Sequence, residues 1–302
     1  MPELELEREL DLAVPDRTWF AEVNRTRLRV WEWGSPDAPP VICVHGAFDH
    51  GRMWDGFAPR LAGLGFRVLC PDLRGHGDSG RLGTGHMWLA SALDLAELAR
   101  LVGGGEPVGF VGHSFGGGQS LYVAGVWPEV VRWVVNLDGL GPPADQFEQR
   151  DIVEAATNSM TALARVSGPP RVYPSLDDMA ERRGRVNVRL PGPWVEHLVR
   201  HGAAEVEGGG WVWKSDPMFS AGLPGDFDLA YLYAEFEMVT SVPVLVLTGS
   251  EHDTWSEMTD DEVADRVSHL PTAVHRVIDG AGHYVHVEQP EAVLAAIAEF
   301  VR

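Results

Sequence analysis

Residues 108–118, VGFVGHSFGGG, decide the fold of this 302-residue chain. The segment begins with the apolar run Val108–Val111, and Gly112-His113-Ser114-Phe115-Gly116 then matches the pattern G-x-S-x-G. A helical stretch follows from Gly117. Glycines in such a turn let two backbone segments approach closely where a side chain would clash. A strand, a sharp turn and a helix in this order predict a nucleophilic Ser114 at the C-terminal edge of a sheet.

Apolar runs on both sides of this segment predict a mostly parallel sheet. Most of them end at a turn that contains Gly, Pro or Asp, and runs that are apolar on both faces are typical of parallel strands covered by helices. The expected strands are Val41–Val44, Arg67–Cys70, Val108–Val111, Val130–Leu137, Val242–Thr248 and Val274–Ile278. Ahead of them, Trp19–Val23 and Leu28–Trp33 predict an N-terminal hairpin.

Helical stretches alternate with these strands, and this alternation is typical of the α/β class. The expected helices are Met53–Leu64, Leu89–Val102, Gly117–Val126 and Pro290–Val301. Pro290 suits the first turn of the last helix, because the amide that proline lacks has no partner there.

The composition changes between residues 141 and 239, where Gly, Pro, Arg and Trp are frequent and no strong apolar strand run occurs. The stretch lies between two strands of the regular alternation. We therefore predict a core formed by residues 1–140 and 240–302, with residues 141–239 inserted as a cap or lid of irregular helices.

A serine needs a base to act as a nucleophile near neutral pH. His283 lies in Gly280-Ala281-Gly282-His283-Tyr284, between the last strand and the last helix, and this loop also opens at the C-terminal edge. His283 is preferred over His286, which leads into the helix and is expected to cap or pack. His113 is expected to pack, because neighbouring side chains diverge at a sharp turn.

The base in turn needs a carboxylate that fixes its tautomer. Asp253 follows the strand Val242–Thr248, and Asp138 follows the strand Val130–Leu137. Both carboxylates come after the C-terminal end of a strand, so either can face the base. Asp253 is the preferred acid, Asp138 is the alternative and Glu251 is a distant third.

The nucleophile also needs backbone amides that stabilise an oxyanion. One is expected from Phe115, the residue after the serine. The second is expected from the loop after Val41–Val44, where Gly46 lets the chain turn and present the amide of Ala47 or Phe48.

The order of nucleophile, acid and base, with His45-Gly46 before them and Asp72-Leu73-Arg74-Gly75-His76-Gly77-Asp78-Ser79 between, resembles the α/β-hydrolase superfamily of Ser-His-Asp enzymes. The resemblance covers nearly the whole chain outside the insertion. It implies that Ser114, Asp253 and His283 form the triad and that residues 72–79 form a structural loop held by Asp72 and Arg74. Some members of the superfamily carry the acid after the preceding strand, so Asp138 remains the alternative acid.

The resemblance further implies hydrolysis of a small or medium carboxylic ester through an acyl-enzyme. Lactones, amides and the carbon–carbon bonds of diketones are alternative substrates for the same triad. The related dehalogenases and epoxide hydrolases carry Asp at the nucleophile position, and Ser114 argues against both. A catalytically silent ligand-binding relative is the alternative from another class.

Aromatic residues are expected to line a pocket for an apolar acyl or alcohol group. Phe48 and Trp54 are placed on its floor. The insertion is expected to supply the roof from Tyr173, Trp194, Trp211, Trp213 and Phe219.

The net charge of −20 repels phosphate backbones and anionic membranes, so the expected partner is a small-molecule substrate rather than nucleic acid or a membrane. The sequence leaves open whether the chain forms a homo-oligomer. Cys43 and Cys70 each lie in an apolar run and are expected to be buried thiols. No signal peptide, membrane span, metal cluster or cofactor motif is recognised, and a cytoplasmic location is expected.

Overall fold

The computed structural model describes residues 10, 12–81, 87–147, 153, 157, 160–161, 164–166, 168–217, 228–253, 255 and 257–302. Eight strands form one sheet in the order β1-β2-β4-β3-β5-β6-β9-β10. The pairs β1–β2 and β2–β4 are antiparallel, and the other neighbours are parallel. The strands are β1 (Arg17–Val23), β2 (Thr26–Trp33), β3 (Pro40–Val44), β4 (Arg67–Pro71), β5 (Val108–His113), β6 (Val131–Leu137), β9 (Val244–Gly249) and β10 (Ala273–Ile278). The predicted α/β class and mostly parallel sheet are confirmed.

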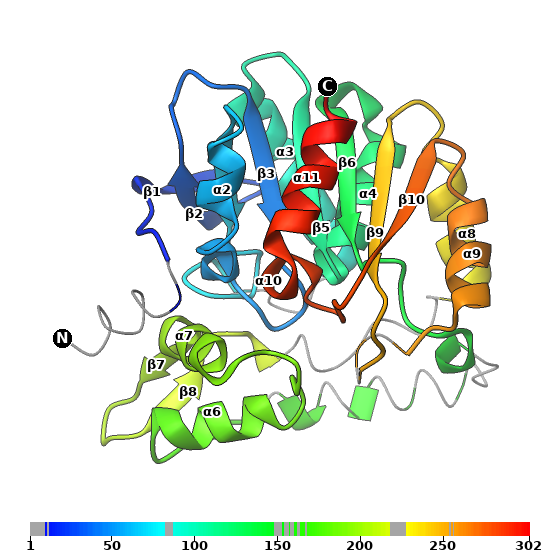
Figure 1. Cartoon of the computed structure of the whole chain (residues 1–302). Helices are drawn as coiled ribbons and strands as arrows, with labels where there is room; N and C mark the ends of the chain where they lie inside the picture. The colour runs from blue at the N-terminus through cyan, green and yellow to red at the C-terminus, as the bar shows by residue number, and fades with distance from the viewer. Residues whose placement is uncertain are drawn as a thin grey trace.

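Helices cover both faces of the sheet (Figure 1). One face carries α2 (Ala58–Ala62), α10 (Val285–Glu288) and α11 (Pro290–Phe300), and the other carries α3 (Met87–Gly103), α4 (Phe115–Val126) and α8 (Leu229–Glu237). The helix α9 (Asp260–Ser268) lies beside β10 in Figure 1. Apolar side chains from both faces of β3, β5, β6 and β9 fill the two helix–sheet layers. Burial on both faces explains why these strands read as continuous apolar runs.

The N-terminal hairpin turns tightly between its strands. Val23 pairs with Thr26, and both residues between them have a positive φ, +40° at Asn24 and +58° at Arg25. Two consecutive positive φ angles are typical of a type I′ turn, whose twist matches that of the strands it joins. The predicted hairpin is confirmed, with a shorter turn than expected.

The helix expected over Met53–Leu64 is divided into a 3₁₀ turn, η1 (Gly51–Trp54), and α2. A side chain at Gly56 would meet the indole of Trp194, and Pro59 occupies the first turn of α2. Proline is tolerated at a helix start but not in a helix interior. Pro59 therefore starts a new helix here instead of continuing one.

The inserted segment contains more strand than the sequence suggested. It holds η3 (Ala144–Phe147), α6 (Leu176–Gly184), α7 (Gly192–Gly202) and a two-stranded sheet of β7 (Ala203–Glu205) and β8 (Trp211–Trp213). α6, α7, β7 and β8 lie together beyond the end of the sheet to which β3 points (Figure 1). We call residues 168–217 the cap.

The helix α8 lies outside the cap. Its Leu232 and Phe236 are buried in the same apolar cluster as Leu121 and Val123 of α4. The expected boundary at residue 239 is therefore corrected, because α8 completes the helical layer over the sheet.

The two cysteines are free and fully buried on neighbouring strands, as expected. No helix of the described residues is both long enough and apolar enough to cross a membrane.

Candidate functional site

Ser114 lies at the sharp turn between β5 and α4. Its backbone φ angle of +52° is one that residues other than glycine rarely adopt. A side chain at Gly112 would collide with the backbone of Gly116, and one at Gly116 would collide with the carbonyls of β3 and the loop after it. Glycine is therefore required on both sides of the serine. Strain of this kind, held by tight surrounding packing, is typical of functional sites.

His283 lies in the loop after β10, and Asp138 directly follows β6. The Oδ2 atom of Asp138 is 2.6 Å from Nδ1 of His283, and both side chains are at least nine-tenths buried. Asp138 has a φ of +50°, and its amide donates to the carbonyl of Leu247 on β9. This contact leaves Nε2 as the ring nitrogen that accepts a proton. The structure thus pairs His283 with the alternative acid.

The preference for Asp253 is corrected by this geometry. Its carboxylate binds two backbone amides, that of Trp255 at 2.8 Å and that of His283 at 3.4 Å. Asp253 therefore ties the loop after β9 to the loop that carries His283, and its contact with the histidine is to the main chain. Glu251, the third candidate, is exposed and faces Arg189 at 3.9 Å.

Two further histidines surround His283 and lie inside the protein. His113 Nε2 lies 2.9 Å from the carbonyl oxygen of His283, and the two rings are 4.6 Å apart. Burial, and next the charge of His283, lower the pKa of His113 well below its ordinary value. His286 is buried against Trp54 and Phe57, and burial lowers its pKa to about 3. Both rings are therefore neutral near neutral pH. His286 packs, as expected, whereas His113 also binds the carbonyl of His283.

The loop after β3 meets the serine turn. Ala47 and Ser114 line one cavity, and Phe115 and Ser114 line another. The amide of Phe48 donates to Nε2 of His76 at 3.3 Å, so this donor is already engaged. Of the two expected donors in the loop, Ala47 is therefore the better candidate, and the expectation for the Phe48 amide is corrected.

Two cavities meet at Ser114. The first has a volume of about 280 Å³ and the second about 600 Å³, and Ser114, His283 and Trp255 line both. Trp255 stacks over His283 with ring centres 6.5 Å apart. The serine and the histidine therefore border both cavities, and a substrate bound at Ser114 can place a group in each.

The expected pocket residues divide into two groups. Phe48 and Trp213 line the second cavity, as expected. The other four pack elsewhere and are corrected: Trp54, Tyr173, Trp194 and Trp211. Trp54 belongs to the layer under α2 and α11, and the other three form the apolar interior of the cap. Phe219 lies outside the described residues.

Two tryptophans in the cavities were missed by the sequence reasoning. Trp255 comes two residues after Asp253, and Trp88 lies on α3, where it donates to Glu235 at 2.9 Å and packs edge-on against Phe115. Burial raises the pKa of Glu235 to about 7. No local pattern distinguishes such residues from core aromatics, although the position of Trp255 just after a strand end was a usable signal.

The loop of residues 72–79 is structural, as predicted. The carboxylate of Asp72 accepts from the amides of Gly51 at 2.7 Å and Asp78 at 2.8 Å, and Arg74 forms an ion pair with Asp94 of α3. Because Gly51 begins η1, Asp72 connects this loop to the segment that follows the Ala47 loop.

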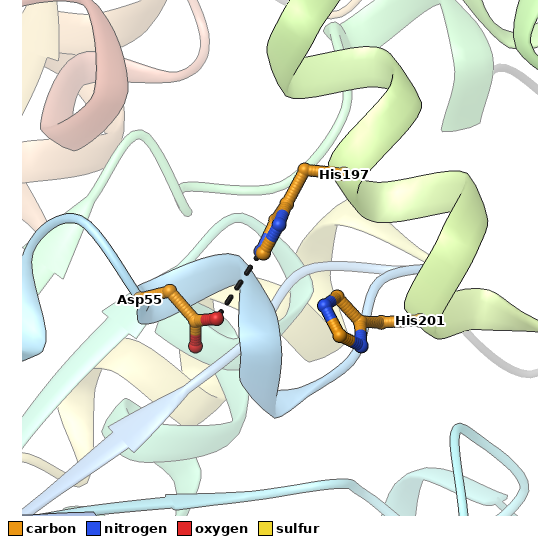
Figure 2. Close-up of side chains that lie close together, drawn as sticks. All are labelled: Asp55, His197 and His201. Carbon is orange, nitrogen blue, oxygen red and sulfur yellow. Dashed lines mark ion pairs between the residues drawn. The ribbon is translucent and has the colours of Figure 1, made fainter. Parts of the chain in front are cut away.

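Among the described residues, Asp55, His197 and His201 bring three atoms of metal-ligand type within 4.8 Å of one another (Figure 2). The two histidines lie one turn apart on α7, an i,i+4 spacing that the sequence reasoning overlooked. His197 Nε2 is 3.2 Å from Asp55, as the dashed line in Figure 2 marks. The Nε atom of Arg52 lies 2.6 Å from the same carboxylate oxygen.

Arg52 already supplies a cation to this cluster. Its Nη1 also lies 3.4 Å from His201 Nδ1, and burial with the charge of Arg52 lowers the pKa of His201 to about 2. The same charge disfavours a divalent ion beside it. The donors therefore fit a hydrogen-bonded contact between α7 of the cap and the core better than they fit a metal ion.

Comparison with known proteins agrees with the fold. The model of the alpha/beta hydrolase family matches residues 41–296. Epoxide hydrolase A from Mycobacterium tuberculosis is 28% identical, with 93% of this chain and 96% of the relative covered. 2-(Acetamidomethylene)succinate hydrolase from Mesorhizobium japonicum is 29% identical, with 93% of each covered. Among solved structures, the thioesterase domain from the curacin biosynthetic pathway superposes with a TM-score of 0.80 at 22% identity, covering 93% of this chain and 98% of that one.

Proposed function

This chain belongs to the alpha/beta hydrolase family, and from that premise we propose that it is a serine hydrolase that cleaves a carboxylic ester through an acyl-enzyme at Ser114. The observation that carries the proposal is the 2.6 Å contact between Asp138 and His283, beside cavities that both Ser114 and His283 line. A carboxylate, an imidazole and a serine at a strained turn are the parts of nucleophilic acyl transfer.

In the proposed reaction, Ser114 Oγ attacks the carbonyl carbon while His283 Nε2 takes the hydroxyl proton. The imidazolium that forms is stabilised by Asp138. Amides of Phe115 and Ala47 bind the oxyanion, and the N-terminus of α4 adds a favourable partial charge. His283 then returns the proton to the leaving alcohol. A water molecule, deprotonated by His283, releases the acid and restores Ser114.

A serine at position 114 favours ester hydrolysis over the epoxide hydrolysis named for one relative, Epoxide hydrolase A. Superfamily epoxide hydrolases resemble this chain but carry an aspartate as nucleophile, and a serine forms an acyl ester with a carbonyl substrate instead. Lactones and diketones offer the same carbonyl electrophile. They belong in the same substrate screen as esters of rising chain length.

Pre-steady-state hydrolysis of p-nitrophenyl butyrate tests the proposal. We expect p-nitrophenol release with a rapid phase of one equivalent per active site wherever deacylation is the slower step, and a mass increase of one butyryl group on the quenched protein. Ser114→Ala should show neither, while its circular dichroism spectrum remains that of the folded chain. A folded wild-type protein that turns over no ester, lactone or diketone, and forms no adduct, would favour the ligand-binding alternative.

A further inference from the structure

The two cavities that meet at Ser114 differ in chemistry. The first is lined largely by aromatic and aliphatic side chains, prolines and glycines, and among the described residues its acidic groups are Asp138, which is bound to His283, and Glu257. Of the described residues, three arginines line the second, Arg182, Arg183 and Arg185, against a single carboxylate, that of Asp49. In a chain with a net charge of −20, this concentration of positive charge beside the nucleophile calls for a specific explanation.

Arg183 forms the fixed part of this cluster. It is 8% exposed, forms an ion pair with Asp49 and donates to the carbonyl of Phe48 at 3.2 Å. Its Nε has no hydrogen-bond partner among the described residues. A buried guanidinium with an uncommitted donor is costly unless another acceptor arrives. Asn187 and Tyr284, both more than nine-tenths buried, supply further polar groups to the same wall.

Arg182 and Arg185 provide the charge that Asp49 does not neutralise. Arg182 is exposed and has no ion-pair partner among the described residues, whereas Arg185 pairs with Glu181 one turn away. The side chains of Arg185 and Glu181 are 72% and 66% exposed, and surface ion pairs of this kind contribute little to stability. Arg185 can therefore exchange Glu181 for a stronger acceptor at small cost.

We propose that the second cavity is a carboxylate-binding subsite and that the preferred substrate is an ester carrying a free carboxylate on one side of the scissile bond and an apolar group on the other. This inference rests on the proposed function, because it assigns the substrate class of that same site. Arginine binds carboxylates through two parallel hydrogen bonds, and such a pair gives direction as well as affinity. The carboxylate enters the second cavity, and the apolar group enters the first.

The direct test compares pairs of esters of equal shape that differ only in charge. Benzyl hydrogen glutarate is compared with benzyl 5-methylhexanoate, in which an isopropyl group replaces the carboxylate. In the first pair the carboxylate is on the acyl side of the ester. A second pair, 4-(butyryloxymethyl)benzoate and 4-isopropylbenzyl butyrate, places it on the alcohol side. We expect kcat/KM to be at least about tenfold higher for the anionic ester of one pair, the gain from a charge-assisted hydrogen bond. Added NaCl should raise KM for that ester.

Arginine variants then assign the preference to the subsite. Arg182→Gln and Arg185→Gln should each lower the ratio of anionic to neutral kcat/KM several-fold, and the double variant should abolish the preference. Both positions are exposed, so the fold tolerates the change. Arg200→Gln is the matched control, because Arg200 is an exposed cap arginine on α7 that lines neither cavity. It should leave the ratio unchanged. Equal rates within both pairs, unaffected by the arginine variants, would overturn the subsite while leaving ester hydrolysis standing.

A binding measurement separates the subsite from the chemistry. Ser114→Ala is titrated calorimetrically with benzyl hydrogen glutarate and with 4-(butyryloxymethyl)benzoate, each against its neutral partner, with and without the Arg182→Gln and Arg185→Gln changes. Tighter binding of an anionic ester that disappears with the arginines supports the subsite even if the wild-type protein hydrolyses nothing. Equal binding of both members of each pair contradicts it.

Discussion

The residue before the serine holds the backbone of the proposed base: His113 Nε2 lies 2.9 Å from the carbonyl oxygen of His283. His113 is 1% exposed, and its lowered pKa keeps the ring neutral, so Nε2 donates its hydrogen to this carbonyl without adding a second charge beside His283. The turn that carries Ser114 and the loop that carries His283 are thereby connected through one side chain.

Replacing His113 tests this positioning role. His113→Phe retains a ring but loses the donor, and we expect kcat on p-nitrophenyl butyrate to fall about tenfold with little change in KM, the loss from a misplaced base. His113→Gln retains a donor and should recover part of the rate. If both variants lose rate and stability equally, His113 acts by packing alone.

The choice of acid is tested by Asp138→Asn and Asp253→Asn. An amide at position 138 stabilises the wrong tautomer of His283 and cannot stabilise the imidazolium. We therefore expect kcat to fall by about 10⁴-fold, as for the acid of a catalytic triad. Asp253→Asn removes charge from a contact to backbone amides and should cost less than about tenfold. Steady-state rates decide which aspartate is the acid, with circular dichroism as the folding control. A larger loss of rate in Asp253→Asn than in Asp138→Asn would identify Asp253 as the acid.

Backbone strain at Ser114 predicts a stability gain from glycine. At a φ of +52°, Ser114→Gly should be more stable than Ser114→Ala by about 1 kcal/mol in urea unfolding, because glycine adopts this conformation without penalty. Ser268 near the end of α9 provides the control, since there Gly should be less stable than Ala by roughly 0.5–1 kcal/mol. The same sign at both positions would exclude strain at Ser114.

The buried His286 makes stability depend on pH. Burial lowers its pKa from 6.5 to about 3, so below pH 6.5 the unfolded chain binds a proton that the folded chain does not. Its contribution to stability is complete above pH 6.5 and is lost as the pH falls toward 3, at up to about 1.4 kcal/mol per pH unit.

The variant His286→Phe isolates this contribution, because other groups cancel when the two proteins are compared. The free energy of unfolding in urea, measured at pH 6.5, 5.5 and 4.5, should fall less steeply for His286→Phe than for the wild type. Parallel curves for the two proteins would show that His286 is not the group responsible.

The strands and the serine turn were predictable because their signals are local. The strands buried on both faces read as apolar runs, and the glycines around Ser114 are required by contacts within a few residues or with the neighbouring β3. The position of His283 followed from its loop between the last strand and helix. These features agree with the structure to within two or three residues at each boundary.

The acid and the pocket walls depend on how loops meet in space. Asp138 and Asp253 both follow a strand, but β6 adjoins β5 whereas β9 lies one strand further, and the Asp253 carboxylate is used by backbone amides. The spacing of residues along the chain does not contain this information. In the cap, Tyr173, Trp194 and Trp211 were assigned to the pocket because aromatic residues serve equally in binding and packing.

Covalent labelling with a fluorophosphonate is the most direct test of whether Ser114 is a nucleophile activated by His283 and Asp138. We expect one adduct per chain, located by peptide mapping on Ser114, absent from Ser114→Ala and formed far more slowly by Asp138→Asn than by Asp253→Asn. A folded protein that stays unlabelled, or one labelled equally in Ser114→Ala, would contradict this role of Ser114.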